Sequence, residues 1–175
     1  ALGIASLTAA PADTTAGAHS DFRLNLALSG ASDDLRDLRI DLPPGLIGNP
    51  QATPRCTRAQ LRADACPAAS QVGSTRVTAA ALGLQVDSDG TVYNVEPDPG
   101  DPAKLGIVVR PIGGLLGKFV LESPISVRDA GDYGLTSTLT DMPRSLSGIP
   151  IDVRAIDLRL RGAVAGGGAF MTNPT

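Results

Sequence analysis

The carboxylates between residues 96 and 101 have the spacing that best fits metal binding. Glu96, Asp98 and Asp101 are separated by prolines and a glycine, and carboxylate oxygens are the ligands that Ca²⁺ prefers. The same residues also fit a solvated acidic turn, in which each Asp begins a proline turn. We therefore expect no resident metal or cofactor. A Ca²⁺-dependent binding module that uses these three residues is kept as an alternative.

A second set of carboxylates has the residue types of a glycoside hydrolase. Asp37 and Asp41 would have to meet Glu122 or Asp157 at about 5–10 Å, the separation that glycosidic cleavage requires. The segments around these acids are also rich in arginine. Cross-strand ion pairs on a solvated sheet face explain that pattern more simply. A secreted carboxylate-dependent hydrolase is kept as a second alternative, and we expect no catalytic residues.

His19 is the single histidine of the chain, so a Ser-His-Asp site would have to use it. It lies between Ala18 and Ser20, and no Gly-x-Ser-x-Gly segment supplies a nucleophile elsewhere. A histidine in a loop that makes a local hydrogen bond explains it better. The residues Asp87, Ser88, Asp89 and Gly90 open like a calcium loop, but the Glu expected at its twelfth position is Asp98. Asp89-Gly90 instead predicts the tip of a hairpin over residues 84–95.

The two cysteines, Cys56 and Cys66, have nine residues between them. Zinc sites use four ligands, and this chain has too few Cys and His for one. We predict that Cys56 and Cys66 form a disulfide; the alternative is two unpaired thiols in a cytosolic protein. A disulfide that closes so short a loop contributes about 2.5–3 kcal/mol on the chain-entropy model. Between the cysteines, Thr57 and Gln60 have the spacing of a capping box and predict a short helix over residues 57–63.

Alternation of apolar and polar residues dominates the rest of the chain. It predicts strands with one solvated face in segments such as 22–28 and 38–42. Residues 104–110 are mostly apolar, which indicates a strand that is buried on both faces. The alternation over 151–161 changes phase near Ala155, as a β-bulge would make it do.

The predicted fold is all-β. Many short strands separated by Gly and Pro turns favour an antiparallel β-sandwich, Ig-like or jelly-roll-like, with one short helix; an open barrel fits the same pattern. We expect one domain over residues 1–162. Residues 163–175 are predicted to be a flexible Gly-rich tail that leads to a further module or rests against a neighbouring copy.

Composition argues against two classes of partner. The 15 Lys and Arg are dispersed, the net charge is −3 and aromatic residues make up 3% of the chain. A nucleic-acid surface needs clustered cations or stacking aromatics, so we expect no nucleic-acid binding. No apolar stretch reaches the length of a membrane span, so we expect no membrane insertion.

Several short motifs together resemble a known group of proteins. They are Leu-Pro-Pro-Gly-Leu-Ile-Gly-Asn-Pro at 42–50, Cys-x9-Cys-Pro at 56–67, Ser-Gln-Val-Gly at 70–73 and Val-Tyr-Asn-Val-Glu-Pro at 92–97. In this order they resemble large, uncharacterised secreted proteins of soil actinobacteria. The resemblance spans nearly the whole chain and implies export, but it brings no catalytic residues.

These observations favour a non-catalytic, extracellular structural or adhesive module of a secreted or cell-surface protein. The disulfide and the turn-rich composition suit an oxidising compartment. The expected partners are other modules or copies of the same protein. The sequence specifies neither a ligand nor an oligomeric state.

Overall fold

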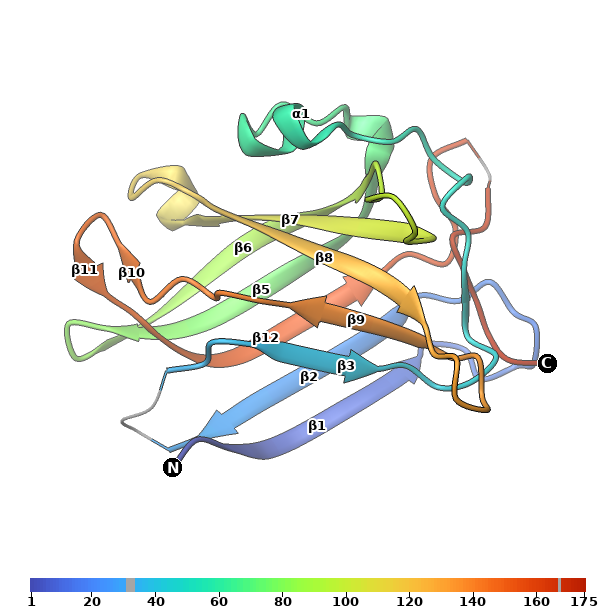
Figure 1. The fold of residues 1–175 in the computed structure, drawn as a ribbon. Helices are drawn as coiled ribbons and strands as arrows, with labels where there is room; N and C mark the ends of the chain where they lie inside the picture. Colours follow the sequence, from blue (N-terminus) through green and yellow to red (C-terminus); the bar gives the residue numbers. More distant parts are fainter. Residues whose placement is uncertain (31–33, 167) are drawn as a thin grey trace.

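The chain folds around one large antiparallel sheet (Figure 1). The computed structural model describes residues 1–30, 34–166 and 168–175. Nine strands form the sheet in the order β1-β2-β12-β5-β6-β7-β8-β9-β3, which confirms the predicted all-β class. These strands are β1 (Gly3–Pro11), β2 (Phe22–Ser29), β3 (Leu38–Asp41), β5 (Gln71–Ala81), β6 (Leu84–Val95), β7 (Ala103–Pro111), β8 (Phe119–Val127), β9 (Leu135–Leu139) and β12 (Asp152–Leu160).

Two short strand pairs and three short helical segments complete the described fold. The pair β10–β11 follows β9 in the chain, and the pair β4–β13 joins two segments that are far apart in sequence. Their bounds are β4 (Ile47–Gly48), β10 (Ser145–Leu146), β11 (Ile149–Pro150), β13 (Met171–Thr172), α1 (Arg58–Arg62), and the 3₁₀ turns η1 (Ala68–Ser70) and η2 (Ile112–Gly114).

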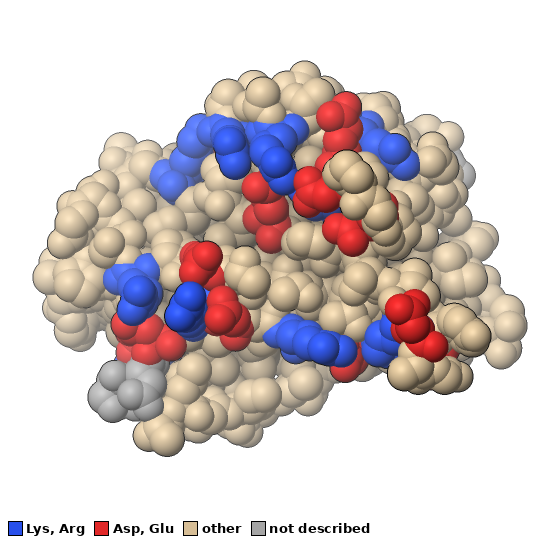
Figure 2. Space-filling view, in the orientation of Figure 1, with Lys and Arg blue, Asp and Glu red and all other residues tan. Residues whose placement is uncertain are grey.

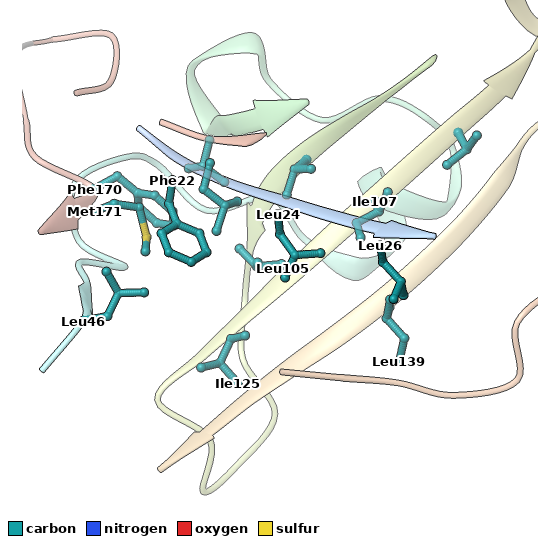
Figure 3. Packing of buried hydrophobic residues seen from close by; sticks show 14 of the residues in the cluster. Phe22, Leu24, Leu26, Leu46, Leu105, Ile107, Ile125, Leu139, Phe170 and Met171 are labelled. Atoms are coloured by element: carbon teal, nitrogen blue, oxygen red, sulfur yellow. The ribbon is translucent and has the colours of Figure 1, made fainter. Parts of the chain in front are cut away.

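The strands form one continuous, curled sheet instead of the two separate sheets that the sandwich prediction implies. Its inner face contributes alternate side chains from nearly every strand to a single apolar core. Strands from distant positions in the sheet order, such as β2 and β9, face one another across this core. Figure 3 shows the packing, with Phe22, Leu24 and Leu26 of β2 near Leu105, Ile107, Ile125 and Leu139.

Strand β7 is buried on both faces, as its apolar sequence predicts. Leu105, Ile107 and Val109 point into the main core, whereas Val108 packs outside the sheet under α1 in a second cluster with Leu61. Gly106 lies directly beneath the helix, where an added Cβ would come within 2.6 Å of the Leu61 side chain. The glycine therefore lets α1 sit close to the sheet.

The helix and the disulfide match the sequence prediction. Thr57 caps α1: its hydroxyl accepts a hydrogen bond from the Gln60 backbone N–H, and its own backbone N–H donates to Gln60 Oε1. Cys56 and Cys66 form a disulfide with a Cα–Cα distance of 5.3 Å. The backbone of Cys56 also forms a bridge with Val95 at the end of β6. The loop that carries α1 is thus attached to the sheet where the disulfide begins.

The predicted hairpin over residues 84–95 is wrong. Residues Leu84–Val95 form the single strand β6, and the chain reverses earlier, at Leu82 and Gly83. Both residues have positive φ, 51° and 76°, which suits a tight turn between antiparallel strands. Gly90 lies within the strand, where a Cβ would come 2.8 Å from the carbonyl oxygen of Val108. It permits close approach of backbones instead of making a turn.

The change of phase predicted near Ala155 corresponds to a bulge in β12. Its register against β5 shifts between Val153 and Ala155. The pairing of β12 with β2, which begins at Ala155, continues without a shift to Leu160. The extra residue restores the apolar side chains of β12 to the inner face.

The prediction of a flexible tail over residues 163–175 is corrected. Phe170 and Met171 are buried in the main core, and β13 pairs with β4. Figure 3 shows both side chains beside Phe22. The Asn173 side chain donates hydrogen bonds to the carbonyl oxygens of Asp13 and Thr15, at 2.6 and 2.9 Å. The apolar residues after the glycines thus return the chain to the domain.

Candidate functional site

The most buried charged group among the described residues is Lys104, on the outer face of β7. Its side chain is 1% exposed, and its Nζ lies 2.6 Å from Asp98 Oδ2 and 3.4 Å from Glu122 Oε1. Arg58, the first residue of α1, contacts the same two carboxylates at 2.9 and 2.6 Å. We call these four residues the Lys104 cluster. Figure 2 shows basic and acidic side chains gathered on this upper part of the molecule.

Electrostatics in the Lys104 cluster keep both carboxylates ionised. The hydrogen bond from Lys104, together with the nearby charges of Lys104 and Arg58, lowers the pKa of Asp98. Burial acts to raise the pKa of Glu122, but the hydrogen bond from Arg58 and the charge of Lys104 outweigh it, so the net pKa is lowered. A general acid needs a raised pKa. The arrangement therefore suits a structural ion-pair network better than acid catalysis.

The hydrolase carboxylates lie in separate parts of the sheet. Asp41, at the end of β3, accepts hydrogen bonds from Thr136 at 2.7 Å and from Arg39 at 3.1 Å. These bonds lower the pKa of Asp41, with that from Thr136 contributing most. The Asp37 carboxylate accepts a hydrogen bond from the backbone N–H of Asp141, and Asp157 lies on β12. Among the described residues, Glu122 pairs with Arg58, Arg62 and Lys104 and with none of these three acids.

The acidic loop does not gather its side chains around one point. The Asp98 carboxylate faces Lys104 and Arg58, whereas Glu96 is exposed beside the Cys56 bridge. The backbone N–H of Asp101 donates a hydrogen bond to the carbonyl oxygen of Asp98 at 3.0 Å, which closes a turn. Across the described residues, no group of three His, Cys, Asp or Glu side chains could hold a metal ion.

His19 makes a long-range contact instead of the local hydrogen bond that the sequence predicts. Its Nδ1 lies 2.9 Å from the hydroxyl of Thr172 on β13. The neighbouring Ser20 hydroxyl accepts a hydrogen bond from the backbone of Asp13, and Asp21 pairs with Arg159. Each member of the triad that His19 would need is thus held by a different partner.

Two apolar cavities open from the interior of the curled sheet. The first, of about 100 Å³, lies between β2, β3 and the chain around Met171. The second, of about 230 Å³, lies beside the turn that connects β5 to β6, next to the β10–β11 pair. No ionisable side chain lines either cavity in the described part of the chain.

Sequence reasoning missed both the Lys104 cluster and the cavities. Lys104 stands at the start of an apolar strand, and its partners come from a loop, a helix and the next strand. The available signal was a single lysine in a segment predicted to be buried on both faces, because a buried ammonium requires a carboxylate partner. The cavities depend on the curl of the sheet, which alternation of residues does not specify.

Comparison with protein-family models, with curated proteins and with solved structures finds no match to this chain. Among the described residues, no helix is long and apolar enough to cross a membrane. The fold and the site therefore rest on the geometry described above.

Proposed function

We propose that this chain is a non-catalytic module of an exported protein, with a structural or adhesive role. One observation carries the proposal. The acids that are candidates for catalysis are engaged by cations and hydroxyls, and within the described ranges no ionisable group lines either cavity. Hydrolysis needs a reactive acid or nucleophile next to a space that admits substrate.

Export is supported by the disulfide. Cys56 and Cys66 are bonded, and disulfides persist mainly in oxidising compartments. The bond closes the loop that holds α1 against β7, so its loss would loosen the second apolar cluster. The resemblance of the motif order to that of secreted actinobacterial proteins implies the same compartment.

A mechanical role is supported by how the ends of the domain are fastened. β1 adds an edge strand to β2, and the C-terminal strand β13 pairs with β4. Backbone bonds also join Gly17 to Pro174 and Ala18 to Asn173. Both terminal segments are therefore held by the body of the domain, which suits a module that transmits load between neighbours.

A substrate screen tests the absence of catalysis. The purified chain is incubated with polysaccharide, ester and peptide substrates, alongside Glu122→Gln, Asp41→Asn and the control Glu96→Gln. We expect no turnover above that of a heat-denatured sample. Turnover that disappears in Glu122→Gln or Asp41→Asn but survives in Glu96→Gln would overturn the proposal.

Export is tested by the state of the cysteines. The protein is collected from the cytosolic and culture fractions of its natural host, and free thiols are alkylated before mass measurement. We expect secreted material without alkylated cysteines. Retention in the cytosol with two alkylated cysteines would contradict the assignment.

A further inference from the structure

The larger cavity is enclosed by the turn between β5 and β6, the η2 turn and the β10–β11 pair. Its volume is about 230 Å³, and Ser88 is the one polar residue among the described residues that line it. An apolar cavity of about 150 Å³ stays dry and holds benzene. The space here is larger than that and has the polarity of a hydrocarbon site.

Alternation along β5 and β6 builds one wall of this cavity. Val77, Ala79 and Ala81 of β5 line it, and Ala80 between them does not. The small side chains of Ala79 and Ala81 leave the space open. Ser88 on the neighbouring strand β6 pairs in register with Val77 and is buried.

Exposed leucines surround the entrance. Leu82 is 78% exposed at the β5–β6 turn, and Leu115 is 83% exposed next to η2. Leu84 and Ile112 line the cavity and are also exposed, so the apolar surface runs from the interior to the outside. In Figure 2 the outermost tip of the far left end, where Figure 1 places β11 and the β5–β6 turn, is uncharged on the face shown, and charged side chains begin just inside it.

Two cations flank the lining residues. Lys118 precedes Phe119, and Arg144 follows Pro143, and both side chains are exposed. The charge of Lys118 acts on Asp64, beside α1, and helps to lower its pKa, whereas Arg144 makes no ion pair with a carboxylate among the described residues. The acids beside the lining are engaged: Asp87 accepts from Thr78 at 2.7 Å, and Asp152 pairs with Arg154. The surroundings therefore favour an anionic head group over a cationic one.

We propose that this cavity binds the hydrocarbon chain of a fatty acid-like amphiphile, which enters between Leu82 and the β10–β11 pair. The cavity is partly open to solvent and lined by apolar side chains, and a flexible hydrocarbon chain can fill such a recess. The exposed leucines extend the contact along the chain outside the cavity. Arg144 follows the lining residue Pro143 and is exposed, so we assign it to the carboxylate head group.

Titration calorimetry with dodecanoate, kept below its micelle concentration, tests the proposal. We expect saturable binding with one molecule per chain. Ala79→Phe fills the cavity and should weaken binding at least tenfold. Ala80→Phe adds the same bulk on the other face of β5 and should leave binding unchanged. Arg144→Gln should weaken dodecanoate binding more than binding of dodecanol, whereas Lys118→Gln should leave both unchanged.

Thermal unfolding measures whether the Ala79→Phe variant is folded, so that a loss of binding can be assigned to the filled cavity. Ala79→Phe should melt at or above the temperature of the unmodified chain, because it fills empty space. If it unfolds, the smaller change Ala81→Leu takes its place in the titration. Absence of saturable dodecanoate binding, or equal binding by the Ala79 and Ala80 variants, would overturn the proposal.

Two further measurements test whether the exposed leucines contact a membrane or a second copy of the chain instead of an amphiphile. Flotation with phosphatidylglycerol vesicles, in the absence of dodecanoate binding, would assign the leucines to a bilayer surface and overturn the proposal. Light scattering that shows a dimer, dissociated by Leu82→Asn with Leu115→Asn while dodecanoate does not bind, would assign them to a second copy instead. A monomer that binds dodecanoate without floating supports the proposal.

Discussion

Lys104 shows how single residues hold this domain together. A fully buried ammonium is costly unless carboxylates surround it. Asp98 and Glu122 supply two, and Arg58 in turn balances the charge of both. The network connects α1, the β6–β7 loop, β7 and β8, so its value lies in fixing the position of the helix on the sheet.

Removal of both acids should destabilise the domain through Lys104. The double variant Asp98→Asn with Glu122→Gln leaves the buried ammonium without a carboxylate, and we expect a loss of about 3 kcal/mol in the free energy of unfolding. The measurement is urea denaturation at neutral pH. Adding Lys104→Met should recover most of the loss, because no buried charge then remains.

An exposed pair provides the comparison. Arg76 and Asp89 are 60% and 76% exposed, so Asp89→Asn should change stability by less than about 1 kcal/mol. Two results would contradict the role given to Lys104. One is a loss of unfolding free energy in the Asp98→Asn, Glu122→Gln variant as small as that in Asp89→Asn. The other is no recovery of stability when Lys104→Met is added to that double variant.

At the scale of elements, α1 is a short helix that depends on its attachments. It has five residues, far fewer than the 12–15 or so that an isolated helix needs. The disulfide, the capping box and the Asp64–Arg110 pair hold it at its two ends. Leu61 then packs over Gly106 between them.

Loss of the disulfide should lower stability more than loss of the cap. Cys56→Ser with Cys66→Ser should cost about 2.5–3 kcal/mol in the free energy of unfolding, and Thr57→Ala about 1 kcal/mol. Guanidinium denaturation followed by circular dichroism measures both. Equal losses, or a larger loss for Thr57→Ala, would show that the short loop is ordered without its covalent closure.

The C-terminal segment should contribute to stability. Phe170 is 6% exposed in the main core, so Phe170→Ala should cost about 3–5 kcal/mol. Deletion of residues 163–175 should lower the melting temperature further, because β4 then loses its partner. Leu115→Ala is the control, since that leucine is 83% exposed. An unchanged melting temperature after the deletion would show that the segment is only a tether.

The sequence predicted those elements whose signals are local. The capping box at Thr57 and the two cysteines lie within one short loop, and the bulge in β12 changes an alternation that can be read directly. The turn at Leu82 and the return of Phe170 to the core were missed. Asp89-Gly90 has better turn residues than Leu82-Gly83, and only the pairing with β5 and β7 shows that Gly90 lies inside a strand.

At the scale of the whole molecule, apolar side chains line the inside of a curled sheet and ion pairs occupy its outside. Alternation predicted the two faces, and hence the all-β class. The strand order could not be predicted, because β12 enters between β2 and β5 from far along the chain. The cavities at the two ends of the core follow from that order and were not predictable either.

The paired acids make the whole domain sensitive to low pH. Hydrogen bonds and neighbouring cations lower the pKa of several carboxyl groups below the ordinary value of about 4. The unfolded chain therefore binds more protons than the folded one at acid pH, and stability rises with pH in that range. The groups with a lowered pKa are Asp13, Asp21, Asp41, Asp64, Asp98, Glu122 and Asp132.

We expect the free energy of unfolding to be at its full value above about pH 5 and to fall as the pH passes below about 4. Urea denaturation at intervals from pH 7 to pH 2.5 measures the curve. Glu122→Gln should make the acid limb shallower, because it removes one group whose pKa is lowered by folding. Glu96 makes no side-chain ion pair among the described residues, so Glu96→Gln should leave the slope of the acid limb unchanged. A flat curve down to pH 3, or equal slopes for the Glu122 variant and the unmodified chain, would show that packing of the interior, and not the ion pairs outside it, sets the acid stability of the domain.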